Sequence, residues 1–588
     1  MNKVDAKTDV KNMKRNRIVS LNRGVGGIFL LISVLCSLIL PIKANAGSNR
    51  EIRIGLYFKD ESKKINSEIS IFNISAGKGL EIYYCKDGNF DKLADITDNT
   101  TLIVRKDSYF VRKGNSLTEY VPNKGNTDNG NKGYEIGPYH IRIGSGHQDY
   151  ESAAQASEQL ADKGVKAYPA YEDGVWYVFT GFYADEGTAN ADLSNTIINT
   201  LGEGDYQIVV PEPNKKGIVL STGTDDNVIG MVFCSNEYIQ IRPSEENDPY
   251  IFNINGSNYR GYIEVRRLNG SDMTVINVLP VEQYLYGVVP CEMGADSPYE
   301  ALKAQAIVAR TYTYDNLGKY SLLGFDLCNT VLSQVYKGYD YEKAATNKAV
   351  DETRDEIVAY NGSVASVFYF SSSGGRTEAV RNVWSADIPY LQSVEDKYEE
   401  GNSRYYNWEI SFTAAEINNI MAPWKDKLGE VLGIAITKTS EAGRAIEMIV
   451  TGTKGEVKFE RSKCREVFGL PSQWFSIVTD GGVTVLSTVN SNELKSTVKL
   501  SGQNVITASG LSTLTAGKSI SVLGEGGQKK EISLASDTYT FVGKGYGHAV
   551  GMSQEGAKGM AKAGFDYKEI LCHYFTGAYV SNISEILK

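Results

Sequence analysis

The chain has 588 residues, a formal net charge of −10 and seven cysteines. This length allows several domains, and the acidic charge balance argues against a nucleic-acid partner, which would need a basic face. The cysteines are scattered and form no C-x-x-C pair, so the sequence predicts neither a disulfide-rich miniature fold nor a thiolate metal site.

Residues 1–46 have the features of an export signal. Lysines and arginines precede an apolar run from Val25 to Ile42, which ends at Ala44-Asn45-Ala46, a small-x-small site. A cleaved signal peptide and an uncleaved anchor both remain open, since about 18 apolar residues just span a bilayer. Either way, we expect the rest of the chain to lie outside the membrane and to be attached to it only through this segment.

Residues 47–136 alternate apolar and polar positions, as in "IRIGLYF", and predict strands followed by a Gly- and Asn-rich linker. Residues 137–212 then repeat a strand–helix–strand order. The first helix is predicted to begin near Asp149 and end at Gly164, and the second to end at Gly202 or Gly204. Two such units make βαββαβ, a four-stranded sheet with two helices on one face.

Segment 137–212 resembles the SPOR domain, a module with which bacterial envelope proteins bind peptidoglycan strands stripped of their stem peptides. The resemblance implies a glycan-binding face, for which the predicted side chains are Arg142, Trp176 and Phe179. Alternate residues of a strand point to opposite faces, so core positions for some of these rings remain an alternative.

Residues 213–588 predict one further domain. Strand alternation covers 213–278, helical periodicity covers 281–317 and 552–574, and a β-rich insertion interrupts the domain at about 481–540. The whole chain is therefore predicted to be a multidomain α+β protein.

A single glutamate, Glu292, lies between the two helices predicted in 281–317. The first, "VEQYLYGV", has apolar residues at helical spacing and is predicted to stop at Pro290. The second is predicted from Ser297, with Glu300 completing a capping box. An apolar surround raises the pKa of a carboxyl group and suits a general acid, whereas a helix N-terminus lowers it. A solvated or ion-paired glutamate is the alternative.

Four motifs, in order, resemble the SpoIID/LytB family, named for stage II sporulation protein D and the amidase enhancer. They are "LPVEQYLYGVVPCEM", "QVYKGY", "VFYFSSSGGRTE" and "GKGYGHAVGMSQEG", within about residues 255–588. The resemblance implies a β-rich catalytic core in which a helical pair carries the active-site turn. It also implies a lytic transglycosylase that cleaves the MurNAc–GlcNAc bond of denuded glycan and leaves 1,6-anhydroMurNAc ends.

The glutamate of the family's P-x-E-M motif is catalytic, and Glu292 holds that position here. One carboxyl group can serve such a reaction, whereas ordinary glycosidases need two. Asp296 is a nearby second acid, predicted to cap the next helix or to stabilise a cation. The other motifs imply a substrate groove, with these predicted contacts: Arg310, Gln334, Ser372, Ser373, His548 and Gln554. For His548, a structural role between two loops is the alternative.

Two departures from the family bear on the chemistry. Ala549 stands where the family usually has glycine. Some relatives hold zinc with a Cys/His cluster, of which only Cys328 remains here, and zinc needs about four ligands, so no metal is predicted. The Gly-rich motif lacks the GK[ST] ending of a phosphate loop, so no nucleotide and no other cofactor is predicted.

Three functions compete. The first is a secreted or membrane-tethered lytic transglycosylase of the cell wall, in remodelling linked to sporulation, with denuded glycan strands as its partner. The second is a non-enzymatic protein that binds the wall and enhances an N-acetylmuramoyl-L-alanine amidase, which would then be a protein partner. The third is a structural scaffold of the envelope.

Overall fold

The computed structural model describes residues 50–587, apart from several short gaps. The gaps are residues 98, 115, 123–132, 211–215, 223–226, 235–236, 245–248, 269–271, 400–402, 480–481, 490–491, 500–503, 508–509, 514–518, 524–528 and 534–537. The predicted leader and most of the predicted linker lie outside the described residues. Among the helices that are described, none is long and apolar enough to cross a membrane.

A seven-stranded sheet joins the first strands of the chain to strands that precede the predicted catalytic helices. Its order is β22-β1-β21-β20-β17-β5-β6. β1 (Glu51–Tyr57) pairs antiparallel with β21 (Asp272–Pro280), so the sequence-predicted segments 47–136 and 213–278 share one sheet. The remaining strands are β5 (Leu80–Lys86), β6 (Asn89–Ile96), β17 (Tyr238–Pro243), β20 (Tyr262–Leu268) and β22 (Leu327–Cys328).

Residues 139–209 follow the strand and helix order that the sequence predicts. Asp149 caps the first helix by accepting a hydrogen bond from the Ser152 N–H at 2.8 Å, and Gly202 ends the second helical segment at φ 85°. Leu160, Ala189 and Ile141 share one apolar cluster, which places both helices on one face of the sheet. The elements are β11 (Tyr139–His147), α2 (Tyr150–Asp162), β12 (Ala167–Glu172), β13 (Val175–Tyr183), α3 (Glu186–Asp192), α4 (Ile198–Leu201) and β14 (Tyr206–Val209).

The four strands of this segment do not form a sheet of their own. They take the order β14-β11-β13-β12 at one end of a ten-stranded sheet, because β12 pairs in parallel with β16 (Asn227–Cys234). The other strands of the sheet, in spatial order, are β15 (Lys216–Thr222), β7 (Leu102–Lys106), β4 (Ile71–Ser75), β18 (Ile251–Ile254) and β19 (Ser257–Arg260).

Two of the three side chains predicted to face glycan are buried in this sheet. Trp176 packs against Tyr150 of α2, with 5.1 Å between ring centroids, and Phe179 stacks on His140 at 5.7 Å. His140 in turn contacts the Asp107 carboxylate at 3.1 Å. The prediction of exposed rings at 176 and 179 is wrong, because α2 covers one face of β13, and on the other face Phe179 packs in a cluster with Val219 and Met231.

Arg142 differs from these two rings because it is partly exposed. Its guanidinium lies over the ring of Tyr177, 5.0 Å from the centroid, and this ring is also partly exposed. A cation and an aromatic ring side by side suit a sugar ligand, so glycan binding by Arg142 stays a prediction.

Helix α5 (Val281–Glu292) is longer than predicted, because it continues through Pro290. Proline lacks the N–H that would bond to the preceding turn. The Met293 N–H bonds to the Val289 carbonyl at 2.9 Å and completes the last turn. The predicted stop at Pro290 is therefore wrong, and Glu292 is the last residue of the helix.

Helix α6 (Tyr299–Asp315) begins two residues later than predicted. Pro298 precedes it, and no side chain caps its first turn. Glu300 accepts instead from the Tyr567 N–H at 3.1 Å, so the predicted capping box is wrong. Asp296 is exposed and does not cap this helix either.

Helix α6 is buried on two sides, which holds the end of α5 in place. Ala306 and Ala309 join the apolar cluster of the seven-stranded sheet, together with Leu285 and Val288 of α5. Leu302 and Val308 join a second cluster. That second cluster draws on α7 (Ala344–Glu352), β23 (Glu356–Tyr360), α11 (Gln554–Lys562) and α12 (Tyr567–Tyr574).

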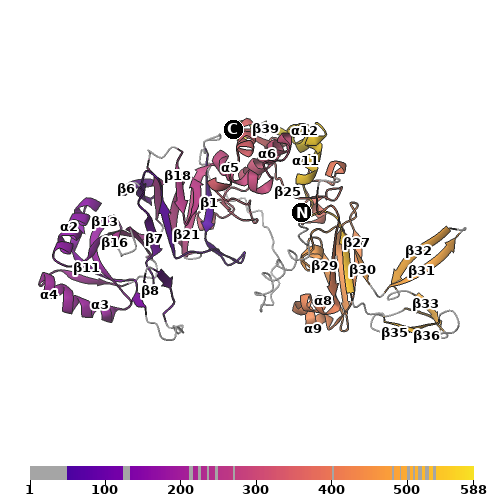
Figure 1. The fold of residues 1–588 in the computed structure, drawn as a ribbon, viewed down its shortest axis with the longest axis horizontal. Coiled ribbons are helices and arrows are strands. Elements are labelled where there is room, and N and C mark those ends of the chain that lie inside the picture. Colours follow the sequence, from indigo (N-terminus) through magenta and orange to yellow (C-terminus); the bar gives the residue numbers. More distant parts are fainter. Residues whose placement is uncertain are drawn as a thin grey trace, which may run out of the picture. The chain divides into compact units, whose positions relative to one another are not determined.

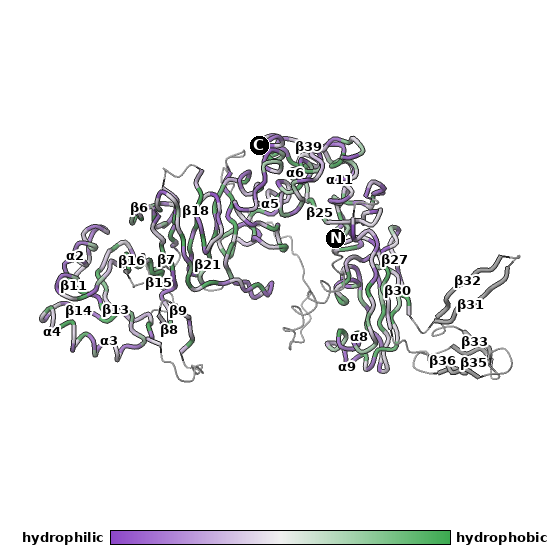
Figure 2. Tube along the Cα trace, viewed as in Figure 1, coloured by the Kyte–Doolittle hydropathy of each residue, from purple (hydrophilic) through white to green (hydrophobic). Residues whose placement is uncertain are grey.

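Residues 408–479 and 538–543 form a β lobe with its own core, which the sequence had not separated (Figure 1). Its two three-stranded sheets have the orders β26-β37-β30 and β27-β28-β29. In Figure 2, hydrophobic residues lie along both β27 and β30, and the buried ones include Val431, Ile434 and Phe475. The strands are β26 (Trp408–Thr413), β27 (Val431–Thr439), β28 (Ala445–Gly452), β29 (Glu456–Glu460), β30 (Phe475–Thr479) and β37 (Thr538–Gly543).

The predicted β-rich insertion at about 481–540 lies between β30 and β37. The described residues there form three two-stranded hairpins. They are β31 (Gly482–Val489) with β32 (Asn492–Lys499), β33 (Asn504–Thr507) with β34 (Gly510–Thr513), and β35 (Ser519–Leu523) with β36 (Lys529–Ser533).

Candidate functional site

The Glu292 carboxyl lies at the C-terminal end of α5 and is half-buried. Its Oε1 accepts a hydrogen bond from the Val335 N–H at 3.1 Å. The Tyr369 hydroxyl and the Gln554 amide also hydrogen-bond this carboxyl. Tyr369 belongs to β25 (Tyr369–Phe370), and Gln554 is the first residue of α11. Four segments distant in sequence therefore converge on one carboxyl group.

Burial raises the pKa of Glu292 above its ordinary value, and the three hydrogen bonds to the carboxylate oppose this only in part. Glu292 is at the negative end of the α5 dipole, which favours its protonated form further. The predicted opposing effect of the next helix is weak, since α6 begins at Tyr299. A carboxyl with a raised pKa suits a general acid.

Gln334 acts on this site through Tyr369. Its Oε1 accepts from the Thr313 hydroxyl at 3.0 Å, which sets its amide orientation, and its Nε2 donates to the Tyr369 hydroxyl at 3.3 Å. Because the Tyr369 oxygen accepts this bond, its own proton is free to be donated to Glu292. Gln334 is almost completely buried. The prediction that Gln334 contacts substrate is therefore wrong, and it is a positioning residue.

Gln554 lies beside Glu292, where the sequence predicted a site residue. Its Nε2 also donates to the Gln305 Oε1 at 3.3 Å, which ties the first turn of α11 to α6. The Nε2 of Gln305 is buried and has no partner within the described part of the chain. The amide of Gln554 is thus oriented by a second glutamine that the sequence had not marked.

Ser372 and Ser373 were predicted to contact substrate in a groove, but their hydroxyls point into the core. Both residues are buried, and both hydroxyls donate to the Glu399 carboxylate, which also accepts from the Ser373 N–H at 2.6 Å. The serine prediction is wrong because the buried Glu399, 26 residues after Ser373, accepts these hydrogen bonds.

Asp396 is a buried acid close to Glu399, and it accepts a hydrogen bond from the Tyr574 hydroxyl at 2.9 Å. Burial and the Glu399 charge raise the pKa of Asp396 to about 7.

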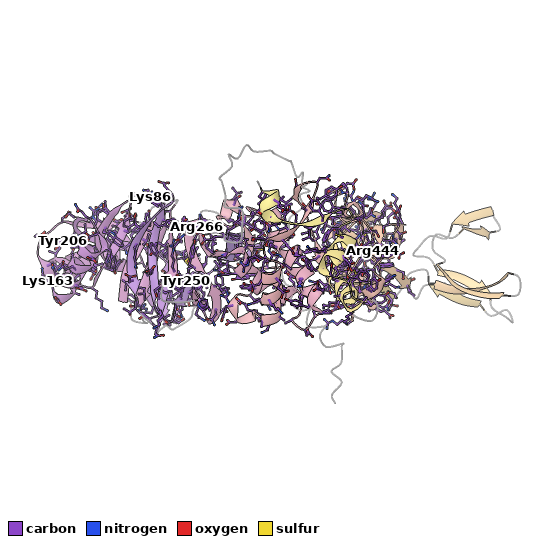
Figure 3. All side chains as sticks on the ribbon, turned by 90° about the horizontal axis from the view of Figure 1, so that it is seen from above. Lys86, Lys163, Tyr206, Tyr250, Arg266 and Arg444 are labelled. Carbon is purple, nitrogen blue, oxygen red and sulfur yellow. The ribbon has the colours of Figure 1, made fainter. Side chains whose placement is uncertain are left out.

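Arg444 of the β lobe, labelled in Figure 3, binds the loop that contains Ser373 and Thr377. Its guanidinium donates to the Ser373 carbonyl at 2.7 Å and the Thr377 carbonyl at 3.2 Å, and lies 4.0 Å from the Glu378 carboxylate. Arg444 is fully buried. The loop that follows Tyr369 is therefore held by two charged groups, Glu399 and Arg444.

Arg310 is not available to a substrate. It is fully buried and makes two hydrogen bonds of 2.7 Å to the Glu282 carboxylate, and it also donates to the Val350 and Glu356 carbonyls. The substrate-contact prediction is wrong because this guanidinium joins α5, α6 and α7 within the core. Glu282, its partner, is also buried.

His548 fits the structural alternative more closely than substrate contact. Its Nδ1 accepts from the Val550 N–H at 3.1 Å, and its ring lies 5.0 Å from the ring of Trp384 and 5.4 Å from that of Phe370. Burial lowers the pKa of His548 to about 3, so the imidazole is neutral at ordinary pH. A neutral ring in this position joins the Gly-rich loop to Phe370 of β25 and to Trp384.

Ala549 adopts a φ of +67°, in the left-handed region, and is buried. Ala549→Gly is expected to raise the free energy of unfolding by about 0.5–1 kcal/mol, because glycine removes the strain of a left-handed alanine but adds freedom to the unfolded chain. Urea unfolding measures this. The matched control is Ala561→Gly in α11, which is expected to lower stability by about 1 kcal/mol. A loss of stability in both variants would contradict the strain at position 549.

Tyr369 is the site residue that the sequence missed. It lies three residues before Ser372 in the motif "VFYFSSSGGRTE", but a tyrosine inside a strand is also typical of a hydrophobic core. Only the direction of its hydroxyl toward Glu292 distinguishes the two roles.

Cys328, which remains from a zinc cluster in some relatives, is buried among hydroxyl groups. Its sulfur lies 3.3 Å from the Thr330 hydroxyl, 3.4 Å from that of Ser333 and 3.5 Å from that of Tyr320. Within the described ranges, no three His, Cys, Asp or Glu side chains gather as ligands for a metal. Burial alone would raise the pKa of the Cys328 thiol, but the hydrogen bonds with these hydroxyl groups hold it below its ordinary value.

A cavity of about 420 Å³ lies beside the first turn of α5, and not at Glu292. Its two arginines are already paired, Arg260 with Glu342 at 2.6 Å and Arg354 with Asp351 at 2.8 Å. The cavity therefore has no charge that a ligand must satisfy.

Comparison with protein families gives two matches. The model described as stage II sporulation protein matches residues 269–360, which include Glu292 and Gln334. A domain of unknown function matches residues 385–492, which include most of the β lobe.

Individual relatives are about 30% identical to the chain over the parts that align. An uncharacterised protein of Brachyspira hyodysenteriae is 31% identical over 57% of this chain and 76% of the relative. The amidase enhancer of Bacillus subtilis is 30% identical over 51% of this chain and 40% of its own length. Stage II sporulation protein D of Bacillus subtilis is 28% identical over 53% of this chain and 76% of its own length.

Proposed function

The chain belongs to the SpoIID/LytB family, and from this premise we propose that it is a peptidoglycan lytic transglycosylase. The relatives indicate a cell-wall function related to sporulation. The proposed reaction cleaves the bond from MurNAc to GlcNAc in denuded glycan strands and leaves 1,6-anhydroMurNAc ends.

The observation that carries this proposal is the environment of Glu292. Its carboxyl is half-buried, and the groups that act on it, Val335, Tyr369 and Gln554, are hydrogen-bond donors and not acids. A hydrolase of the usual kind needs a second carboxylate at the bond. An isolated carboxyl with a raised pKa suits a reaction in which one group serves as both acid and base.

In the proposed mechanism, the protonated Glu292 gives its proton to the glycosidic oxygen, and the bond from that oxygen to muramic C1 breaks. The sugar is left as an oxocarbenium ion next to the new Glu292 carboxylate. The C6 hydroxyl of the same sugar attacks C1, and the carboxylate takes its proton as the C1–O6 bond forms. Glu292 is protonated again at the end, and no water is consumed. The donors around Glu292 stabilise the carboxylate between the two proton transfers.

The remaining parts of the chain fit the same role. We propose that the N-terminal segment exports the protein, so that it acts in the wall or at the outer face of the membrane. Segment 137–212, as a SPOR-like module, would hold the same denuded strands and raise the effective substrate concentration without adding catalytic contacts.

A relative's name favours a second candidate function. The amidase enhancer of Bacillus subtilis is 30% identical to this chain. Under this alternative, the protein binds the wall, cleaves nothing by itself and accelerates an N-acetylmuramoyl-L-alanine amidase.

Product analysis by mass spectrometry separates the two functions. The exported part is incubated with peptidoglycan pre-treated with an amidase, and with untreated peptidoglycan. The transglycosylase predicts anhydromuramic ends in the stripped sample. Reducing muramic ends would indicate hydrolysis by water, and no products, together with faster cleavage by an added amidase, would support the enhancer.

The pH dependence tests the role of Tyr369. Its hydroxyl bonds to the charged form of Glu292, so Tyr369→Phe is expected to raise the pKa of Glu292 further. Activity requires the protonated acid and is lost as pH rises through this pKa. The alkaline limb of kcat/KM is therefore expected to move to higher pH in Tyr369→Phe and to stay in place in the control Tyr360→Phe. A limb that moves to lower pH would contradict this role.

A further inference from the structure

Arg465 is a mostly buried cation that forms no ion pair with an acid in the described part of the chain. It lies in the short helix α10 (Lys463–Glu466), and its Nη1 donates a hydrogen bond to the Pro471 carbonyl at 3.1 Å. Its Nε is buried and has no acceptor among the described residues. The neighbouring acid, Glu466, is engaged by Lys463 at 2.7 Å.

Two other buried arginines of this half of the described chain each have an acid beside them, although the Nε of Arg444, like that of Arg465, has no acceptor among the described residues. Arg310 has the Glu282 carboxylate, and Arg444 has Glu378 and three backbone carbonyls. Burial lowers the pKa of Arg465, but a guanidinium stays protonated in proteins. A buried charge without a counter-charge destabilises the fold, and such residues occur where an anion is to be bound.

Backbone hydrogen bonds link the surroundings of Arg465 to the segment that contains Tyr369, which contacts Glu292. The Pro471 carbonyl that holds it also accepts from the Gly547 N–H at 2.9 Å, so the guanidinium lies beside the Tyr546–His548 segment. Tyr546 exchanges backbone hydrogen bonds with Ser372, at 3.0 and 2.7 Å. Ser372 is three residues from Tyr369, so their Cα atoms are at most about 11 Å apart.

An exposed aromatic surface accompanies this cation. The Tyr546 side chain is 40% exposed, and its ring packs on that of Tyr405 with 4.5 Å between centroids. Aromatic rings of this kind present an apolar face together with a polar hydroxyl, and the apolar face of a sugar ring can stack on them. A guanidinium without a counter-ion would bind an anion, and the exposed ring beside it would bind a sugar. Together they suit one ligand, an acidic sugar.

We propose that Arg465 binds the free lactyl carboxylate of a muramic acid residue in the glycan strand, next to Tyr546. This inference rests on the proposed function. In intact peptidoglycan the stem peptide is joined to that carboxylate through an amide, which is neutral. Removal of the peptide leaves an anion that a guanidinium can bind with two hydrogen bonds. Arg465 thus supplies the selection for denuded strands.

The test compares three variants of the exported chain on two soluble substrates. The substrates are amidase-treated glycan and the same glycan with its carboxylates converted to methylamides by a carbodiimide. The chain with Arg465 intact is expected to have at least a tenfold higher kcat/KM on the carboxylate form. In Arg465→Gln and Arg465→Met this ratio is expected to fall to about one, whereas Arg461→Gln, which removes an exposed charge of the same lobe, keeps it.

Binding measured in a Glu292→Gln background keeps the inference separate from the proposed function. If no variant cleaves glycan, the proposed activity fails, but a tenfold loss of affinity for the carboxylate form on Arg465→Gln still supports the subsite. Equal binding of both substrates by the chain with Arg465 intact would overturn it. The unfolding temperature of Arg465→Met is expected to stay constant or rise, and a fall with equal losses on both substrates also contradicts the proposal.

Discussion

Glu292→Gln is expected to abolish the formation of anhydromuramic ends while glycan binding is retained. The amide keeps the shape of the side chain but neither gives nor takes a proton, and one carboxyl carries both proton transfers of the proposed mechanism. General acid–base catalysis by a single group contributes about 10²–10⁴-fold to a rate, and we expect a loss at the upper end of this range. The measurement is product release from denuded glycan, with co-sedimentation of protein and glycan beside it.

Asp296→Asn is the matched control for this substitution. Asp296 is four residues from Glu292 and exposed, and the groups that act on the Glu292 carboxyl do not include it. Its loss is expected to leave the rate and the products unchanged. A large loss in Asp296→Asn, with reducing ends among the products, would point to a second catalytic carboxylate and to hydrolysis.

Arg310→Leu is expected to destabilise the fold by about 3–5 kcal/mol, the usual cost of leaving one member of a buried ion pair without its partner. Glu282 would remain buried and charged, and the Val350 and Glu356 carbonyls would lose their donor. Urea unfolding followed by circular dichroism measures the change. In the fraction that remains folded, activity per molecule is expected to be close to that of the unchanged protein.

The double variant Glu282→Leu/Arg310→Leu separates packing from charge. It removes both charges, so part of the lost stability is expected to return, and the cycle reports the coupling between the two residues. If Arg310→Leu folds but is inactive, the result would instead support the prediction that Arg310 contacts substrate.

Local patterns in the sequence predicted most of the secondary structure. Strand alternation in "IRIGLYF" and helical spacing in "VEQYLYGV" correspond to β1 and α5, because burial of one face imposes a period of two or 3.6 residues. The helix boundaries differ from the predicted ones. Pro290 lies inside α5, and the first turn of α6 has no capping box, because tertiary packing outweighs these local preferences.

The P-x-E-M motif is enough to mark Glu292 as the candidate acid, and the Gly-rich motif adds Gln554 to the same site. The surroundings of that acid could not be read from any motif. Tyr369, Gln334 and Glu399 meet their partners across tens of residues, so the direction of each side chain depends on packing between distant segments. The same cause turned Ser372, Ser373 and Arg310 inward: buried acids elsewhere in the chain take up their donors, and no local pattern shows where such an acid will lie.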